Sequence, residues 1–311
     1  MSTNIDATRK KGGSIYGRRH VPSRLPSYTH LKFLELIGEG HFSHVYKGIY
    51  KDKFSVAIKL IERGDYDLIN NEIDLLVKLR GCPNIIQLYE FIRDDYTILI
   101  FERIKSLDIE EMLEDITLEQ VKFLVKSLLQ ALESAHSKNI IHRDVKLSNV
   151  LISQDFDEVK LIDWGCGCVI GPNMLTRAGS RTSRPPEMLL GDSNYGTGCD
   201  IWAVGVLILS ILCKGTVPWK DRTGLGIIVH MTKYYGSDDF DRIQDRIGLD
   251  VPQEVEEEMF QDPIIKLESS FDPQMNRLFD PGLIGLMKCL LIIDPIDRPT
   301  ATQALQNPFF L

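Results

Sequence analysis

Apolar residues in the first third of the chain recur at the spacing expected for strands. Short alternating or β-branched runs lie at residues 33–36, 56–61 and 97–101, and such runs are typical of an antiparallel sheet. One helical stretch, residues 67–79, interrupts them and stops at Gly81, because glycine readily ends a helix. The pattern predicts a small β-rich unit with one main helix.

After residue 105 the apolar spacing becomes helical. A core-facing helix is predicted where apolar residues recur at intervals of three and four, at Leu118, Val121, Val125, Leu128 and Leu132. Further helices are expected at 200–212, 281–290 and 301–306. The expected organisation is an α+β fold with a basic arm at 1–30, a small lobe at 31–104 and a larger, mostly helical lobe at 105–311.

Composition and charge narrow the class of protein. The 311 residues are 43% hydrophobic with a net charge of −8, so a buried core is expected and direct binding to nucleic acid is not. No apolar run has the roughly 18 to 20 residues of a membrane span. The six cysteines are scattered without metal-ligand spacing, which favours an intracellular, cytoplasmic or nuclear location.

A glycine pair between two strand-like runs is the first candidate for chemistry. Gly38 and Gly40 have no Cβ, so phosphate oxygens can approach the backbone closely. An ordinary hairpin is the alternative, because glycines between strands often mark only a turn. The predicted nucleotide-binding residues here are Ile37, Gly38, Gly40, Ser43 and Val45.

Lys59 ends the apolar run at 56–61, and Glu72 lies within the following helix. At helical spacing Glu72 shares a face with Leu68, Leu75, Leu76 and Leu79. A buried carboxylate without a partner is strongly unfavourable, so we expect an ion pair between Lys59 and Glu72. A partly exposed glutamate is the alternative.

The segment 142–151, His-Arg-Asp-Val-Lys-Leu-Ser-Asn-Val-Leu, and the later Asp163-Trp164-Gly165 resemble the catalytic elements of protein kinases. The resemblance implies a two-lobed protein-kinase fold and phosphoryl transfer from ATP with Mg²⁺. It assigns Asp144 to accept the substrate hydroxyl proton, Lys146 to the γ-phosphate, and Asn149 and Asp163 to the metal. Lys59 would also contact the ATP phosphates. Glu102 and Ile104, at the expected hinge, join the nucleotide-binding residues.

Two further segments carry the resemblance. Pro185-Pro186-Glu187 stands at the family's Ala-Pro-Glu position, and Arg298 matches the arginine that pairs with that glutamate. Asp200 resembles the aspartate that braces the catalytic loop.

Several residues resemble the casein kinase II catalytic subunit. Trp164, between Asp163 and Gly165, is typical of that family. The resemblance implies serine or threonine substrates with acidic flanks, received by Arg177, Arg181 and Arg184, although structural pairing or solvent exposure is the alternative for these arginines.

The resemblance to casein kinase II leaves substrate recognition, regulatory partners and the second nucleotide open. The lysine run that the family carries before its helix glutamate is absent at residues 62–67, and docking of a regulatory β subunit is open, as is use of GTP. A relative of the replication-initiating cell-cycle kinases and a non-catalytic kinase-fold scaffold are the alternative functions. The resemblance also implies that the basic arm clamps the activation segment, which is the stretch from Asp163 to Glu187, with nuclear targeting as the alternative.

Overall fold

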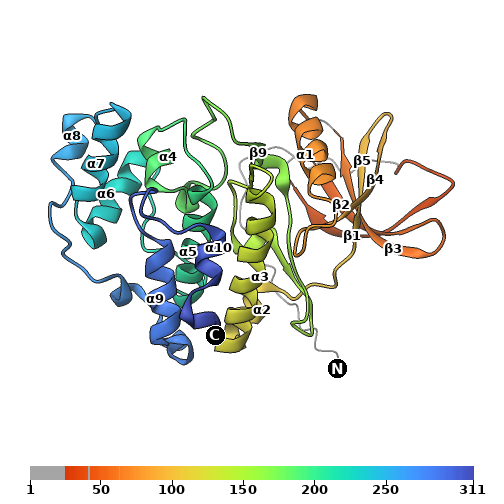
Figure 1. The fold of residues 1–311 in the computed structure, drawn as a ribbon. Coiled ribbons are helices and arrows are strands. Elements are labelled where there is room, and N and C mark those ends of the chain that lie inside the picture. Colours follow the sequence, from red (N-terminus) through yellow and green to blue (C-terminus); the bar gives the residue numbers. More distant parts are fainter. Residues whose placement is uncertain (1–24, 41–42, 63) are drawn as a thin grey trace, which may run out of the picture.

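In the part of the chain that the structure describes, a five-stranded antiparallel sheet and one helix form the N-terminal lobe (Figure 1). The sheet order is β1-β2-β3-β5-β4. Its strands are β1 (Leu31–Glu39), β2 (Ser43–Tyr50), β3 (Phe54–Ile61), β4 (Leu88–Arg93) and β5 (Thr97–Glu102), and the helix is α1 (Tyr66–Lys78). The computed structural model describes residues 25–40, 43–62 and 64–311. Most of the arm predicted at 1–30 therefore lies outside the described residues.

Helix α1 buries one face in the same hydrophobic cluster as the larger lobe. It begins at an N-cap, Asp65, whose side chain accepts a hydrogen bond from the Asp67 backbone N–H. Glu72 lies on the buried face, as predicted, but Leu68 is 57% exposed. Placing Leu68 on that face was wrong, because Ile69, one residue later, holds the buried position in the first turn.

The larger lobe is mostly helical and occupies the opposite side of the molecule (Figure 1). Its helices are α2 (Ile109–Asp115), α3 (Leu118–His136), α4 (Pro186–Leu190), α5 (Gly198–Leu212), α6 (Gly224–Tyr235), α7 (Asp238–Ile247), α8 (Gln253–Glu256), α9 (Pro281–Leu290) and α10 (Ala301–Leu305). Its short strands are β6 (Ile140–Ile141), β7 (Val150–Ile152), β8 (Val159–Leu161) and β9 (Cys168–Val169). The two-lobed α+β fold is confirmed.

Helix α5 is the centre of this lobe, because nearly every one of its side chains is buried. A helix that is apolar on all faces must be buried, and α5 is buried in the core of this lobe. Helix α3 begins with a capping box in which the side chains of Thr117 and Gln120 each bond the other's backbone N–H. Helices α3 and α9 pack against α10 and α5 respectively, so the helices predicted from the sequence form the framework.

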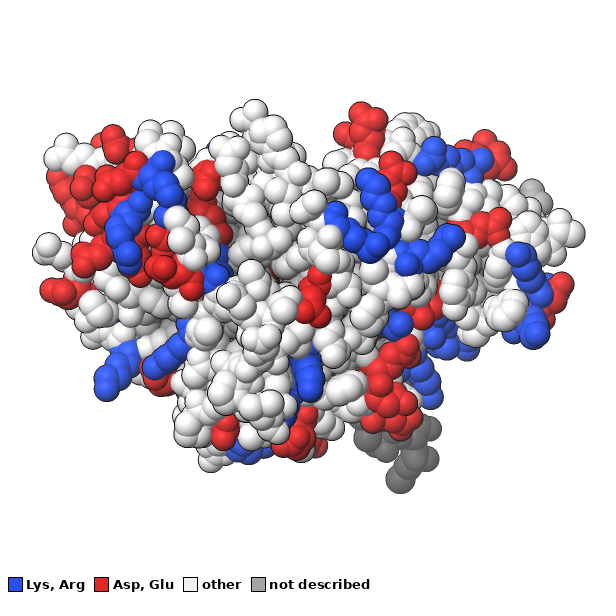
Figure 2. All heavy atoms as spheres, viewed as in Figure 1, with Lys and Arg blue, Asp and Glu red and all other residues white. Residues whose placement is uncertain are grey.

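Acidic side chains gather over α7 and α8 (Figure 2). Helix α8 buries none of its residues, so the acidic stretch at 254–258 faces solvent. Among the described residues, no helix has both the length and the apolar character needed to cross a membrane.

One fully buried ion pair ties α4 to the end of the chain. Arg298 Nη1 lies 2.9 Å from Glu187 Oε1 and Arg298 Nη2 lies 3.2 Å from Glu187 Oε2. The guanidinium also donates to the carbonyl oxygens of Gly198, Ile292 and Ile293. The pairing of Glu187 with Arg298 implied by the sequence is confirmed, and every charge is compensated by a partner.

Removing one partner of this pair should destabilise the fold strongly. Arg298→Ala is expected to lower the free energy of unfolding by about 3–5 kcal/mol, because it leaves the Glu187 carboxylate buried and uncompensated. Urea unfolding followed by circular dichroism measures it. Lys32→Ala, which removes the solvent-exposed pair with Asp52, is the control and should change stability little. Equal effects of the two substitutions would refute the assignment.

Candidate active site

The loop between β6 and β7 is held by a carboxylate from the core. Asp200, at the start of the buried helix α5, accepts the backbone N–H groups of His142 and Arg143, both at 2.8 Å. His136 Nε2 lies 2.9 Å from the same carboxylate. Burial alone would raise the pKa of Asp200, but these partners outweigh it and hold the pKa below its ordinary value. A charged Asp200 therefore fixes the loop that carries the predicted catalytic residues.

Asp144 is held in place through both of its carboxylate oxygens. Oδ1 accepts the Ser180 backbone N–H at 2.7 Å. Oδ2 lies 2.8 Å from Lys146 Nζ and 3.0 Å from Asn149 Nδ2. Burial acts to raise the pKa of Asp144, but hydrogen bonds from Lys146 and Ser180 hold it below the ordinary value. Asp144 is thus an ionised carboxylate at neutral pH, able to accept a proton.

Lys59 and Glu72 form the ion pair expected from their positions. Lys59 Nζ lies 2.7 Å from Glu72 Oε1 and 3.6 Å from Asp163 Oδ1. Burial lowers the pKa of Lys59, yet Glu72 and Asp163 together raise it above its ordinary value. The lysine is therefore charged and links α1 to the segment that follows β8.

Asn149 and Asp163 are brought together by the pairing of β7 with β8. The Ile162 backbone N–H donates to the Asn149 carbonyl at 2.9 Å, next to Asp163. Asn149 uses its Nδ2 to bond Asp144, whereas its amide oxygen has no hydrogen-bond donor among the described residues. The Asp163 side chain is 53% exposed and adopts a left-handed φ of 60°.

These oxygens fit a magnesium ion bound together with phosphates. Mg²⁺ is usually held by one or two protein oxygens, with water and phosphate oxygens as its other ligands. Within the part of the chain that the structure describes, no cluster of three or more His, Cys, Asp or Glu side chains could hold a metal by itself. The donors Asn149 and Asp163 therefore suit a metal that arrives with a nucleotide.

The glycine-rich segment is the hairpin of β1 and β2. Gly38 lies opposite Val45, and Val45 lies opposite Lys59 on β3. The Gly40 backbone N–H donates to the Ser43 carbonyl at 2.8 Å, and a Cβ on Gly40 would lie 2.7 Å from the Ser43 hydroxyl oxygen. The register thus sets the hairpin next to Lys59. Residues 41 and 42, at its tip, lie outside the described residues.

The other predicted nucleotide-binding residues lie at and after the end of β5. The Glu102 side chain is engaged elsewhere, because its Oε1 accepts the Gln87 backbone N–H at 2.8 Å and lies 3.1 Å from Lys160 Nζ. The Glu102 backbone N–H is engaged as well, because it donates to the Gln87 carbonyl at 3.0 Å. Ile104 follows, half-buried, in the segment that leads to α2.

Sequence reasoning missed the residues that dock the activation segment on the catalytic loop. Gly179 has φ of +67°, and a Cβ there would lie 2.0 Å from the Arg143 carbonyl oxygen, so only glycine fits without a shift. The next residue, Ser180, bonds Asp144 through its N–H and accepts from Lys146 Nζ at 2.8 Å through its hydroxyl. The one available signal was the glycine within the arginine-rich segment.

The three arginines predicted to receive acidic substrates differ in their surroundings. Arg184 donates to the carbonyl oxygens of Ala178, Arg177 and Gly179 at 2.6–2.7 Å. For this residue the structure thus shows structural pairing, which was the alternative to receiving an acidic substrate. Arg181 is exposed and donates to the Asp221 carbonyl at 3.3 Å. Arg177 is exposed. The structure therefore leaves Arg177 and Arg181 accessible and engages most of Arg184.

Comparisons with known proteins agree with this arrangement. The family model described as the protein kinase domain matches residues 31–310. The alpha' subunit of casein kinase II from Saccharomyces cerevisiae is 30% identical over 288 residues, which cover 91% of this chain and 85% of that protein. A probable serine/threonine-protein kinase of Dictyostelium discoideum is 30% identical over 289 residues, covering 89% of this chain. Those residues make up 47% of that relative, so this chain spans about half its length. The chain belongs to the protein kinase family and is related to the casein kinase II catalytic subunits.

Proposed function

We propose that this chain transfers the γ-phosphoryl group of ATP, bound with Mg²⁺, to serine or threonine hydroxyls of protein substrates. The observation that carries the proposal is the Asp144 carboxylate, ionised and bonded to Lys146, Asn149 and Ser180. Phosphoryl transfer needs positioning and charge stabilisation more than covalent chemistry from the protein. This set of side chains supplies both.

Each residue then has a defined task. Bound ATP would supply the phosphoryl group, and the Mg²⁺ bound with it would neutralise the negative charge of the phosphates. Asp144 orients the substrate hydroxyl and takes its proton, Lys146 provides a positive charge beside it, and Asn149 and Asp163 offer oxygen ligands. Lys59, kept charged by Glu72, would contact the nucleotide phosphates.

A preference for acidic substrates is part of this proposal. Arg177 and Arg181 are exposed and close in sequence to Ser180, which bonds Asp144. Guanidinium groups bind carboxylates well, and the yeast relative named above is a casein kinase II subunit. Because Arg184 already bonds three carbonyl oxygens, its contribution would be to hold the segment in place.

A serine peptide followed by glutamates tests the substrate preference. With Mg-ATP, the purified chain is expected to phosphorylate this peptide with a lower KM than a matched peptide carrying glutamines. The double variant Arg177→Ala Arg181→Ala should raise KM for the acidic peptide about five- to tenfold, because two exposed charge contacts are lost, and leave the glutamine peptide unchanged. A preference for basic or proline-flanked serines would overturn the claim.

Repeating the same assay with GTP in place of ATP tests whether the chain also uses GTP as a phosphoryl donor.

Removal of the proposed metal ligand separates a kinase from a scaffold. Asp163→Asn should lower kcat by about a hundredfold or more, because the stabilisation that a bound metal gives is worth several kcal/mol. Asp155→Asn, an exposed aspartate in the turn between β7 and β8, is the matched control and should retain activity. A folded wild-type protein that transfers no phosphate to any peptide or protein would favour the scaffold alternative.

A further inference from the structure

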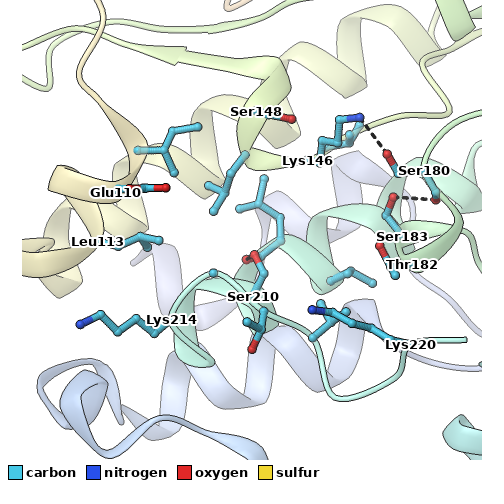
Figure 3. Close-up of a pocket in the computed structure, with 18 of the residues that line it drawn as sticks. Glu110, Leu113, Lys146, Ser148, Ser180, Thr182, Ser183, Ser210, Lys214 and Lys220 are labelled. Carbon is cyan, nitrogen blue, oxygen red and sulfur yellow. Dashed lines mark hydrogen bonds between the residues drawn. The ribbon is translucent and has the colours of Figure 1, made fainter. Parts of the chain in front are cut away.

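A pocket of about 760 Å³ opens beside the catalytic loop, between α2 and the segment that follows α5 (Figure 3). It lies within the range of about 300–1,000 Å³ typical of ligand pockets. Leu113, Val145 and Leu207 give it apolar walls, and Lys146 and Ser180 line one side. Because these two residues bond each other and also Asp144, a polypeptide that presents a hydroxyl to Asp144 must place its neighbouring residues beside this pocket.

The charged residues that line the pocket differ in whether they are already paired. Lys146 is bonded to Asp144, and Lys214 Nζ lies 3.1 Å from Glu114 Oε1. Lys220 is exposed and, among the described residues, has no ion pair or side-chain hydrogen bond. Figure 3 places Lys220 on the side of Thr182 and Ser183, and the exposed Glu110 on the other side near Leu113. The ammonium group of Lys220 and the carboxylate of Glu110 thus lie on different sides of the pocket.

Lys220 is held in position by the residues on either side of it. Trp219 is fully buried, and its Nε1 donates to the Thr182 carbonyl at 3.0 Å. On the other side, Arg181 Nη1 donates to the Asp221 carbonyl at 3.3 Å. The backbone that carries Lys220 is therefore tied twice to the activation segment, which fixes the point at the edge of the pocket from which this side chain extends.

We propose that Lys220 is a specificity-determining residue that receives an acidic side chain of the protein substrate bound in this pocket; the inference rests on the proposed kinase function. Among the described residues, the neighbouring Asp221 carboxylate forms no ion pair with Lys220, and its Oδ1 accepts the N–H and hydroxyl of Thr223, both at 2.8 Å. Glu110 repels an acidic residue at the other end. Lys220 and Arg181 together would favour acidic residues along one edge only.

Peptides that carry a single glutamate, moved one position at a time around the serine, locate the contact. Lys220→Ala should raise KM about two- to fivefold for the peptides whose glutamate reaches Lys220, and Lys220→Glu about tenfold, both with unchanged kcat. The all-glutamine peptide should be unaffected. Lys126→Ala, an exposed lysine on α3 that does not line the pocket, is the matched control.

Binding of a fluorescently labelled acidic peptide, followed by anisotropy, tests the same contact without phosphoryl transfer. Weaker binding by Lys220→Ala than by wild type and Lys126→Ala supports the inference even if no transfer is observed. Equal binding, or an equal loss for acidic and glutamine peptides, overturns it. A wild-type protein that transfers phosphate while Lys220→Ala behaves identically would refute only the role of Lys220 and leave the proposed function standing.

Discussion

The buried carboxylate of Asp200 is the constraint on which the site depends. It stands at the start of the apolar helix α5 and receives the N–H groups of His142 and Arg143. Arg143, held at a φ of 67°, donates from its guanidinium to the carbonyl oxygens of Cys166 and Gly167. The core of the larger lobe therefore positions both the catalytic loop and the segment after Asp163.

The same chain of contacts reaches the smaller lobe. The Gly167 carbonyl, besides its contact with Arg143, accepts Nδ2 of Asn71 at 2.9 Å. Asn71 precedes Glu72 on α1, and Glu72 pairs with Lys59. A shift of α1 would thus break a hydrogen bond and separate a buried ion pair, which is strongly unfavourable once a charge loses its partner. The position of Lys59 is consequently coupled through α1 to the segment that follows Asp163.

The sequence predicted the framework from local signals, because strand alternation and helical periodicity are readable from neighbours in the chain. It gave the charged groups Asp144, Asn149 and Asp163 through the resemblance of two short segments to protein kinases. The exposed position of Leu68 and the docking of Gly179 on Arg143 were not readable, because each depends on which element packs on that residue from a distant part of the chain. Helices α6 to α8 were missed as well. For Arg184, the sequence could offer both alternatives but could not choose, since its partners are backbone carbonyl oxygens that only the folded segment brings together.

The basic side chains of this molecule fall into two groups, those that bond backbone carbonyl oxygens and those that are exposed at the surface. Arg143, Arg184 and Arg298 each donate to two or more carbonyl oxygens, a task suited to the planar guanidinium with its several fixed donors. A lysine ammonium is a compact point charge on a flexible stem, and it is poorly suited to bracing several carbonyl groups at once. Arg184, whose Nε and Nη2 donate to three backbone oxygens, therefore shapes the segment around Ser180 and has few donors left for a carboxylate. Under the proposed function, recognition of a substrate carboxylate would fall instead to Arg177, Arg181 and Lys220, which are exposed at the surface.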